Sequence, residues 1–325
     1  LERPKRRKRV LVIGDSLVMA ENVPEDRTFV VRLGQELAAR LNLEGGIETV
    51  NAGRSGYGLD QSLLLLERDF ATVEPDLVVC VLCAHNDHGD LMRNKLFRLD
   101  EDGELERLRP TLGARVRERF EAVARSSSQP ALQRLWEFRK RGQRLPDREE
   151  PLPAGTMRLY VTALDAQARE HIVDRNPEVV SLFEDIYDMD VAANLEGPMV
   201  RAKRDLMTAV LGRMAEFAAK KSVPLLFVVV PSAVDVCENF GVRVDPVQFP
   251  THSPTRLAES LIASVGLVGG AAIDVTSVLT AAGPADRYFV GGSDMHWNSA
   301  GQAVAASYVA EEVLRDSGAA KALQN

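Results

Sequence analysis

Three stretches of the chain consist almost entirely of hydrophobic residues and are rich in β-branched side chains. They are residues 10–13, 77–82 and 225–230, and two weaker stretches of the same kind lie at 47–50 and 271–275. Short, continuous hydrophobic runs are typical of strands that are buried on both faces, as in a parallel sheet. We therefore predict a parallel sheet of about five strands.

Between these runs, hydrophobic residues recur with helical spacing. A set spaced by four residues begins at Phe29 and ends at Leu41, and would share one helix face. Residues 59–70, 203–220 and 299–316 are predicted to form further helices. Strands that alternate with helices imply right-handed crossovers, and hence a three-layer, doubly wound α/β sheet; five strands fit the flavodoxin-like order.

The start of the last predicted helix carries a local signal. Ser299 is followed three residues later by Gln302, which is the spacing of a capping box. We therefore expect Ser299 to cap this helix.

One connection, between the third and fourth strands, is far longer than a crossover helix needs. We interpret residues 1–325 as a single domain with a core of 8–88 and 201–316 and an insertion of 89–200. The aromatic and leucine content of the insertion predicts several helices. Two interpretations stay open: the insertion is a lid over the functional site, since such segments often control access, or it lies away from the site.

Polar residues follow the predicted strands at the points where the strands end. Ser16 follows the first strand in Gly-Asp-Ser-Leu, Gly53 follows the second in Asn-Ala-Gly, and Asn86 follows the third in Ala-His-Asn-Asp. Asp294 and His296 come after the fifth. Because ligands of open α/β sheets bind at the carboxyl ends of the strands, we expect these five residues to share one rim of the sheet.

These residue types are the ones that acyl transfer requires. A serine hydroxyl such as that of Ser16 is a weak nucleophile until a base takes its proton, and His296 can be that base. A carboxylate on the other ring nitrogen, for which Asp294 is the nearest candidate, fixes the tautomer and stabilises the imidazolium. The amides of Ser16 and Gly53 and the side-chain NH₂ of Asn86 would donate to the oxyanion. The sequence therefore predicts a serine esterase with an acyl-serine intermediate.

Taken together and in this order, the four blocks resemble those of the SGNH/GDSL hydrolases. The resemblance covers about residues 8–89 and 203–315, but not the insertion. It implies Ser16 as nucleophile, His296 as base, Gly53 and Asn86 as oxyanion donors, and neither a metal nor an organic cofactor. It also implies a substrate with a small acyl group, especially acetyl on a carbohydrate, while lipid and thioester substrates stay open.

Two blocks depart from the family pattern. Ala84 stands where Gly-x-Asn-Asp has its glycine. The last block usually reads Asp-x-x-His-Pro, whereas here Ser293 stands three residues before His296, Asp294 stands two before it, and Trp297 replaces the proline. Asp294 is the expected acid because turn geometry can bring its carboxylate to the ring; a backbone carbonyl or another acid is the alternative. The Asp-x-His-Trp sequence is also similar to that of alginate-type O-acetyltransferases, in which the pair precedes the serine.

Each candidate residue also has a simpler structural explanation. Ser16 could cap a helix, Gly53 could be a turn glycine, and Asn86 could satisfy buried backbone groups. Tyr57 and Asp60 could line the substrate pocket or belong only to a helix start.

A hydrolytic metal site is the alternative to the serine mechanism. His85 and His88 flank the Asn-Asp pair, and with Asp90 and Asp294 they offer suitable ligands. No other pair of ligands has matching spacing, so we do not expect a metal.

Charge narrows the classes of partner. The net charge of −7 argues against nucleic acid, because phosphate binding needs a basic face. The basic run of residues 3–9 has two interpretations, a solvated charge run or a segment that flanks a membrane anchor or contacts anionic lipid. No signal peptide is present, and no hydrophobic run reaches the ~20 residues of a membrane span. Because the chain begins with Leu1, an upstream segment that anchors or exports the protein stays open.

Two other functions stay open at this point. An O-acyltransferase would use the same serine, with a sugar hydroxyl in place of water as the attacking group. A non-catalytic carbohydrate-binding or scaffold protein would keep the fold without turnover. The sequence indicates neither the compartment nor the oligomeric state.

Overall fold

A sheet of five parallel strands lies at the centre of the computed structural model, which describes residues 7–94, 96–108, 187–193, 197–241, 244, 246–247, 249–292 and 294–324. Its strand order is β2-β1-β3-β6-β7, and each neighbouring pair is parallel. This is the flavodoxin-like order, so the predicted fold class is confirmed. The strands are β1 (Lys8–Ile13), β2 (Ile47–Asn51), β3 (Leu77–Cys83), β6 (Leu225–Val230) and β7 (Ala271–Asp274).

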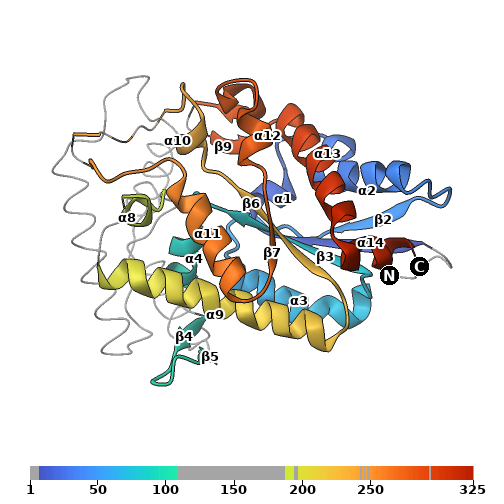
Figure 1. Cartoon of the computed structure of the whole chain (residues 1–325), viewed down its shortest axis with the longest axis horizontal. Coiled ribbons are helices and arrows are strands. Elements are labelled where there is room, and N and C mark those ends of the chain that lie inside the picture. Colours follow the sequence, from blue (N-terminus) through green and yellow to red (C-terminus); the bar gives the residue numbers. More distant parts are fainter. Residues whose placement is uncertain are drawn as a thin grey trace, which may run out of the picture.

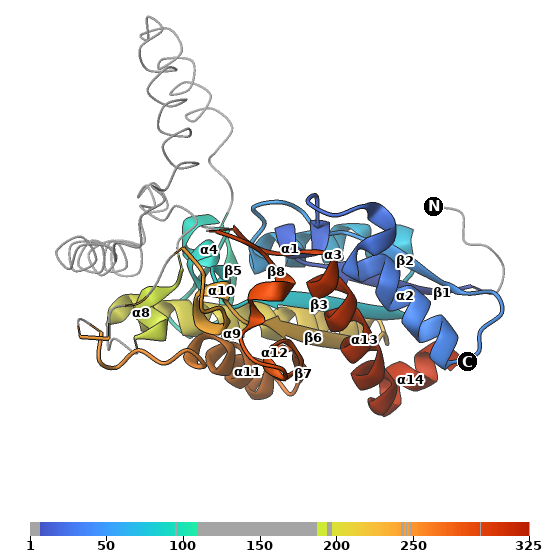
Figure 2. The same cartoon turned by 90° about the horizontal axis from the view of Figure 1, so that it is seen from above.

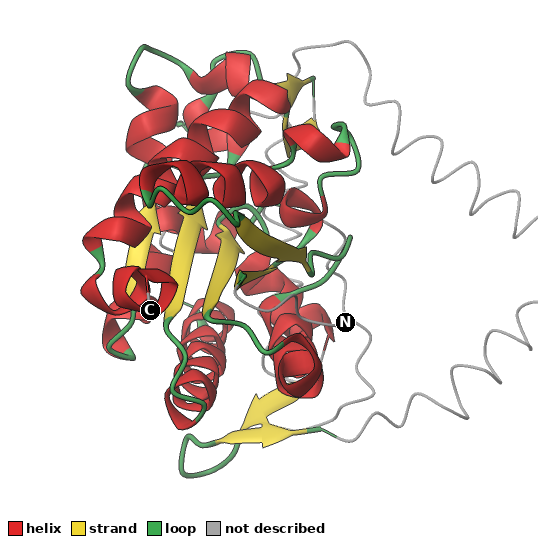
Figure 3. Cartoon of the chain, turned by 90° about the vertical axis from the view of Figure 1, so that its right-hand side faces the viewer, coloured by secondary structure: helices red, strands yellow, loops and turns green. Residues whose placement is uncertain are grey.

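Helices cover both faces of the sheet (Figure 3), because alternate residues of each buried strand point to opposite sides. Val10 and Val12 of β1 belong to the hydrophobic core on one face, and Leu11 and Ile13 to the core on the other. The first face is covered by α2 (Phe29–Arg40), α12 (Thr276–Thr280), α13 (Ser299–Arg315) and α14 (Ser317–Gln324). The second face is covered by α3 (Leu59–Val73), α9 (Pro198–Lys220) and α11 (Arg256–Leu267).

Short elements gather at the end of the sheet to which the strands point. Figures 1 and 2 show α1, α4 and the β8–β9 hairpin toward this end, and α14 at the other. These short elements are α1 (Ser16–Met19), α4 (Asp87–Asn94), α8 (Met189–Ala192), α10 (Ala233–Val236), β8 (Phe289–Gly291) and β9 (Asp294–Trp297), with 3-10 turns at Glu25–Arg27 and Ala285–Tyr288.

The long connection between β3 and β6 is described at its two ends. After α4, β4 (Phe97–Leu99) and β5 (Leu105–Arg107) form an antiparallel hairpin. At the other end, α9 begins at Pro198 rather than at the predicted residue 203, with the proline in the first turn, where a helix needs no amide. Most of the predicted insertion, including its expected helices and lid, falls on residues 109–186, which lie outside the described residues.

The capping box predicted for α13 is wrong. The N-cap is Asn298, whose Oδ1 accepts from the amides of Ala300 and Gly301 at 2.9 and 3.2 Å. The side chain of Gln302 instead accepts from the amide of Phe29 at 2.6 Å, which ties α13 to the start of α2.

The interpretation of residues 3–9 as a solvated charge run is wrong at Arg9. This residue lies within β1 on the side that faces α3, and its side chain is 0% exposed. Its guanidinium donates to Glu48 at 2.8 Å and to the carbonyl of Val73 at the end of α3. A buried cation at that position compensates the helix terminus. Within the described segments, no helix is both long enough and apolar enough to cross a bilayer.

Candidate functional site

Ser16 lies at a sharp turn between β1 and α1. The turn is tight at Gly14, where an added Cβ would come within 2.6 Å of the Val18 side chain. Asp15 is the N-cap of α1, and its side chain accepts from the Leu17 amide at 2.8 Å. Ser16 is therefore the first residue of the helix, where backbone amides have no acceptor within the helix.

Asp294 and His296 lie on β9, which pairs with β8 in an antiparallel hairpin. Residues two apart on a strand point to the same side, so the acid and the ring lie together. Oδ1 of Asp294 accepts from the His296 amide at 2.9 Å and lies 2.6 Å from Nδ1 of the ring. The bond from the His296 amide to Asp294 is a local side-chain turn, as the sequence suggested, and it lies at the start of β9 where the register with β8 is irregular.

The β8–β9 hairpin places the ring of His296 beside Ser16, which lies 280 residues earlier in the sequence. Nε2 of His296 lies 2.7 Å from Oγ of Ser16. With Nδ1 protonated toward Asp294, Nε2 is left as the acceptor for the serine proton. The side chains of His296 and Asp294 are 31% and 44% exposed. The row of carboxylate, imidazole and hydroxyl is thus accessible from solvent at its acid and base.

Asn86 lies close to the end of β3 and is largely buried. Its Nδ2 donates to Oδ2 of Asp90 at 3.1 Å, which leaves a second N–H on the same nitrogen. Its Oδ1 is buried without a partner among the described residues.

Gly53 follows β2 and packs directly on α1. A Cβ at this position would lie 2.4 Å from the backbone nitrogen of Met19, so only glycine allows the close approach. Its amide donates to Oδ1 of Asn51 at 3.0 Å. The amide expected to bind an oxyanion is therefore held by a neighbouring side chain in this structure.

Two buried carboxyl groups adjoin the candidate catalytic residues. Burial raises the pKa of Asp15 to about 6, against the opposing effects of the Leu17 amide and of His296. Burial and the nearby charge of Asp15 also raise the pKa of Asp87, whose Oδ2 accepts from the Cys83 amide at 2.7 Å. The negative charge next to Ser16 therefore falls as the pH drops through 6.

The residues of the metal alternative are not brought together. His85 Nδ1 lies 2.9 Å from Ser232 Oγ, and fully buried His88 bonds Ser260 at 3.2 Å. Burial lowers the pKa of His88 to about 3, so it is neutral at physiological pH. Asp294 is engaged with His296 instead. In the part of the chain that the structure describes, no group of three or more His, Cys, Asp or Glu side chains is arranged to hold a metal ion.

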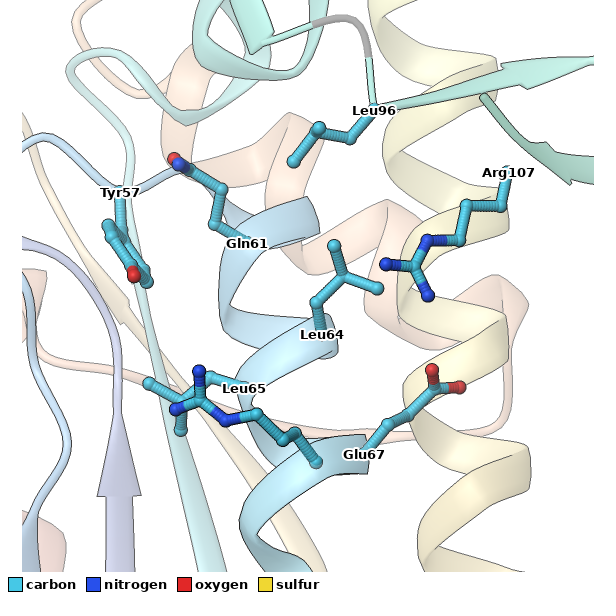
Figure 4. Close-up of a pocket in the computed structure, with 8 residues that line it drawn as sticks. Tyr57, Gln61, Leu64, Leu65, Glu67, Leu96 and Arg107 are labelled. Atoms are coloured by element: carbon cyan, nitrogen blue, oxygen red, sulfur yellow. The ribbon is translucent and has the colours of Figure 1, made fainter. Parts of the chain in front are cut away.

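Tyr57 and Asp60 are not part of the triad. Asp60 is buried in the first turn of α3, where it accepts from Asn94 at 2.8 Å, and burial raises its pKa to about 6. Tyr57 lines a pocket along α3 and the β4–β5 hairpin (Figure 4). In Figure 4, Leu64 of α3 and Leu96 from beside β4 approach each other within this pocket. Its lining includes none of the predicted catalytic or oxyanion residues.

Sequence reasoning missed a buried charge network beside Asn86. Nζ of Lys203 lies 2.7 Å from both Asp188 and Asp190, and all three side chains are at most 3% exposed. Lys203 was expected only as part of a helix, and nothing in its spacing indicates burial. The sequence Asp-Met-Asp at 188–190 was the one available signal, and it is weak.

A second polar cluster joins the start of α8 to the loop after β6. The hydroxyl of Tyr187 lies 2.5 Å from Asp235 and 2.8 Å from Nε2 of His252. Its ring lies 5.7 Å from that of His85. His252, which resembles a loop residue in the sequence, is therefore part of the packing around the β3 end.

Comparisons with known proteins return structures of esterases and lipases. No family model matches the chain, and no curated protein matches it. The lipase/acylhydrolase from Enterococcus faecalis is 12% identical over 94% of this chain and 95% of that chain, with a TM-score of 0.44. The psychrotrophic esterase EstA from Pseudoalteromonas sp. is 11% identical over 95% and 97%, with a TM-score of 0.42. The acetyl xylan esterase AlAXEase is 10% identical over 94% and 99%, with a TM-score of 0.45. The likeness to alginate-type O-acetyltransferases finds no support in these comparisons.

Proposed function

We propose that this protein is a serine esterase that cleaves an ester through an acyl-serine intermediate on Ser16. One observation carries the proposal: Asp294, His296 and Ser16 form a continuous row, with contacts of 2.6 and 2.7 Å. These are the distances at which a base takes a proton from a nucleophile and an acid holds the base.

In this mechanism, Oγ of Ser16 attacks the acyl carbon while Nε2 of His296 takes its proton. The resulting imidazolium is stabilised by Asp294, and then gives the proton to the departing alcohol. Water enters next, gives a proton to Nε2 of His296 and attacks the acyl-serine. The bond between the acyl carbon and Ser16 Oγ then breaks, the acid leaves, and His296 returns the proton to Oγ.

The tetrahedral intermediates need donors aimed at the oxyanion. The second N–H of Asn86 Nδ2 and the amide of Ser16 are the donors that we assign. The Gly53 amide would be a third donor, in which case its bond to Asn51 is shared or released as the oxyanion forms.

The substrate that we propose is the ester of a small acyl group such as acetyl, carried by a carbohydrate. This choice rests on the resemblance of the four sequence blocks to the SGNH/GDSL hydrolases. An O-acyltransferase would form the same acyl-serine, and no contact in the described residues favours a sugar over water as the attacking group.

The test is a panel of p-nitrophenyl esters of increasing acyl length, run on the wild type and on Ser16→Ala. Ser277→Ala is the matched control, because Ser277 is exposed on α12. We expect turnover that is highest with acetyl, lost in Ser16→Ala and unchanged in the control. Wild-type turnover in Ser16→Ala would refute the mechanism.

Two further measurements separate the alternatives. A fluorophosphonate probe should label the wild type at Ser16, whereas a folded protein that resists labelling would be a binding module. Acetate release should be independent of added sugar acceptors, whereas transfer to the acceptor would indicate the transferase.

A further inference from the structure

Asn86 is also the residue directly before α4, in the N-cap position of that helix. Its carbonyl accepts the first helical bond, from the amide of Asp90 at 2.9 Å. A residue in this position normally turns its side-chain oxygen onto an amide of its own first turn. An asparagine that did so would direct its side chain at the helix rather than at a substrate.

The structure shows that another residue takes over this capping bond. The amide of Gly89, in the first turn of α4, donates to Oδ2 of Asp188 at 3.1 Å. Oδ1 of Asn86 meanwhile has no partner among the described residues. The helix is thus capped by a side chain far away in the sequence, and the amide group of Asn86 is not used for capping.

Asp188 is held firmly in this role. Its backbone amide donates to the carbonyl of His85 at 2.9 Å, and its carboxylate accepts from the amide of Gly89. Asp188 is therefore bonded to residues before and after Asn86. Its Oδ1 lies 2.7 Å from Nζ of Lys203 in α9. Burial disfavours the charged Lys203, but Asp188 and Asp190 outweigh this effect and raise the pKa of the lysine, so it is cationic at neutral pH.

The side chain of Asp188 does not cap the helix that follows Asp188 itself. Asp188 is the N-cap of α8, yet its side chain makes no capping bond to that helix. Figures 1 and 2 show α4, α8 and the nearby end of α9 together at one end of the molecule. The carboxylate therefore connects three elements at the site of Asn86.

We propose that Asp188, anchored by Lys203, is a positioning residue that caps α4 in place of Asn86 and so keeps the Asn86 side chain available to the oxyanion. This inference rests on the proposed function, since it assigns the way in which one of its oxyanion donors is held. Without the Asp188 cap, Asn86 Oδ1 would turn to the Gly89 amide, and its Nδ2 would leave the position where it meets the oxyanion.

The variant Asp188→Asn tests this. Asp188 accepts on both oxygens, from Gly89 and from Lys203, whereas an asparagine has one acceptor oxygen and loses one of the two contacts. Asp190→Asn is the matched control. Asp190 uses only Oδ1, for Lys203 and the Val191 amide, and its Oδ2 has no partner among the described residues. Its amide analogue keeps both contacts.

We expect Asp188→Asn to lower kcat for p-nitrophenyl acetate about 10- to 100-fold, the usual effect of a misplaced catalytic group. KM should change less than about threefold, because the oxyanion exists only after attack. Asp190→Asn should stay within about twofold of the wild type. In an Asn86→Ala background, Asp188→Asn should have no further effect, since it acts through Asn86.

Two results would overturn this inference while leaving the proposed function intact. The first is a Ser16-dependent kcat that Asp188→Asn leaves unchanged. The second is a kcat in the Asn86→Ala/Asp188→Asn double variant that falls by the product of the two single losses. Turnover that survives in Ser16→Ala would instead refute the proposed function, and this inference with it. If circular dichroism shows that Asp188→Asn is unfolded, Gly89→Ala provides the test. A Cβ there would lie 2.8 Å from Oδ1 of Asp188 and would displace the cap without removing a charge, so an unchanged kcat in folded Gly89→Ala would also overturn the inference.

Discussion

Replacing Asp294 with Asn separates what its charge does from what its position does. Oδ1 of Asp294 accepts from the His296 amide and contacts the ring at Nδ1. An asparagine can keep both contacts, because its one acceptor oxygen can occupy the Oδ1 position. The ring then keeps its tautomer and orientation, and the protein loses only the negative charge that stabilises the imidazolium.

The expected loss follows from the strength of that one contact. A hydrogen bond to a charged group contributes about 1.5–3 kcal/mol and one between neutral groups about 1 kcal/mol. The difference of about 0.5–2 kcal/mol corresponds to a kcat about 2- to 30-fold lower. Because the Asp294 side chain is 44% exposed, solvent screens its charge and the lower part of this range is expected. Asp294→Ala also removes the orientation of the ring, and its kcat should fall about 10⁴-fold.

The measurement is kcat for p-nitrophenyl acetate at pH 8 on the wild type and both variants. Asp100→Asn is the control. Oδ1 of Asp100 also accepts from two backbone amides, those of Asp102 and Glu104, but it lies in the β4–β5 turn. If Asp294→Ala turned over within about twofold of the wild type, Asp294 would not be the triad acid. If Asp294→Asn lost as much as Asp294→Ala, the amide oxygen would not orient the ring.

Three further predictions concern residues around the site and at the start of α13. Because burial raises the pKa of Asp60 from 3.8 to about 6, its contribution to stability is greatest below pH 4 and is lost as the pH rises through 6. The unfolding free energy of Asp60→Asn minus that of the wild type should therefore be about 2 kcal/mol larger at pH 7 than at pH 4. Urea titrations at the two pH values measure this difference, and equal values would contradict the prediction. Gly53→Ala should lower kcat about 100-fold, since its Cβ would push against the backbone of α1; a normal rate would show that α1 can shift without loss. Asn298→Ala should lower the unfolding free energy by about 2 kcal/mol while Ser299→Ala changes it by less than about 0.5 kcal/mol, and the reverse order would restore Ser299 as the cap.

The centre of the fold could be predicted because β1, β3 and β6 are buried on both faces. A continuous hydrophobic run such as 225–230 leaves no alternative that exposes it. The two edge strands, β2 and β7, are only partly buried, and their hydrophobic runs are correspondingly weaker. Charged residues misled the prediction where the fold buries them. Arg9 resembles its basic neighbours in the sequence, and only its place in β1 opposite Glu48 and the end of α3 shows that it is interior.

In the candidate site, too, some residues could be predicted from local sequence patterns and others could not. Ser16 and Asn86 could be found because each follows a strand of the sheet, and strand ends are where a parallel sheet places its ligands. His296 lies farther along, on the β9 strand of a separate hairpin, and was found through its acid neighbour and the late position of the pair in the chain. Asp188 and Lys203 could not be found, since their roles depend on contacts between segments that no local pattern records. A lysine in a helix is normally solvated, and its burial here depends on two carboxylates that approach it from α8.

Two features of the last sequence block, the position of Asp294 and the aromatic residue after His296, follow from the conformation of β9, whose register with β8 is irregular. On a strand, an acid two residues before His296 lies on the same side as the ring, whereas an acid three residues before would point away. The next residue then points to the opposite side, into the core. Trp297 does so: it is 1% exposed, and its ring lies 6.2 Å from that of Phe29. It also pairs with Phe289 across the hairpin, where a proline would lack the amide of a ladder residue. In this chain, the conformation of β9 therefore accounts both for the position of the acid two residues before His296 and for the buried tryptophan that follows it.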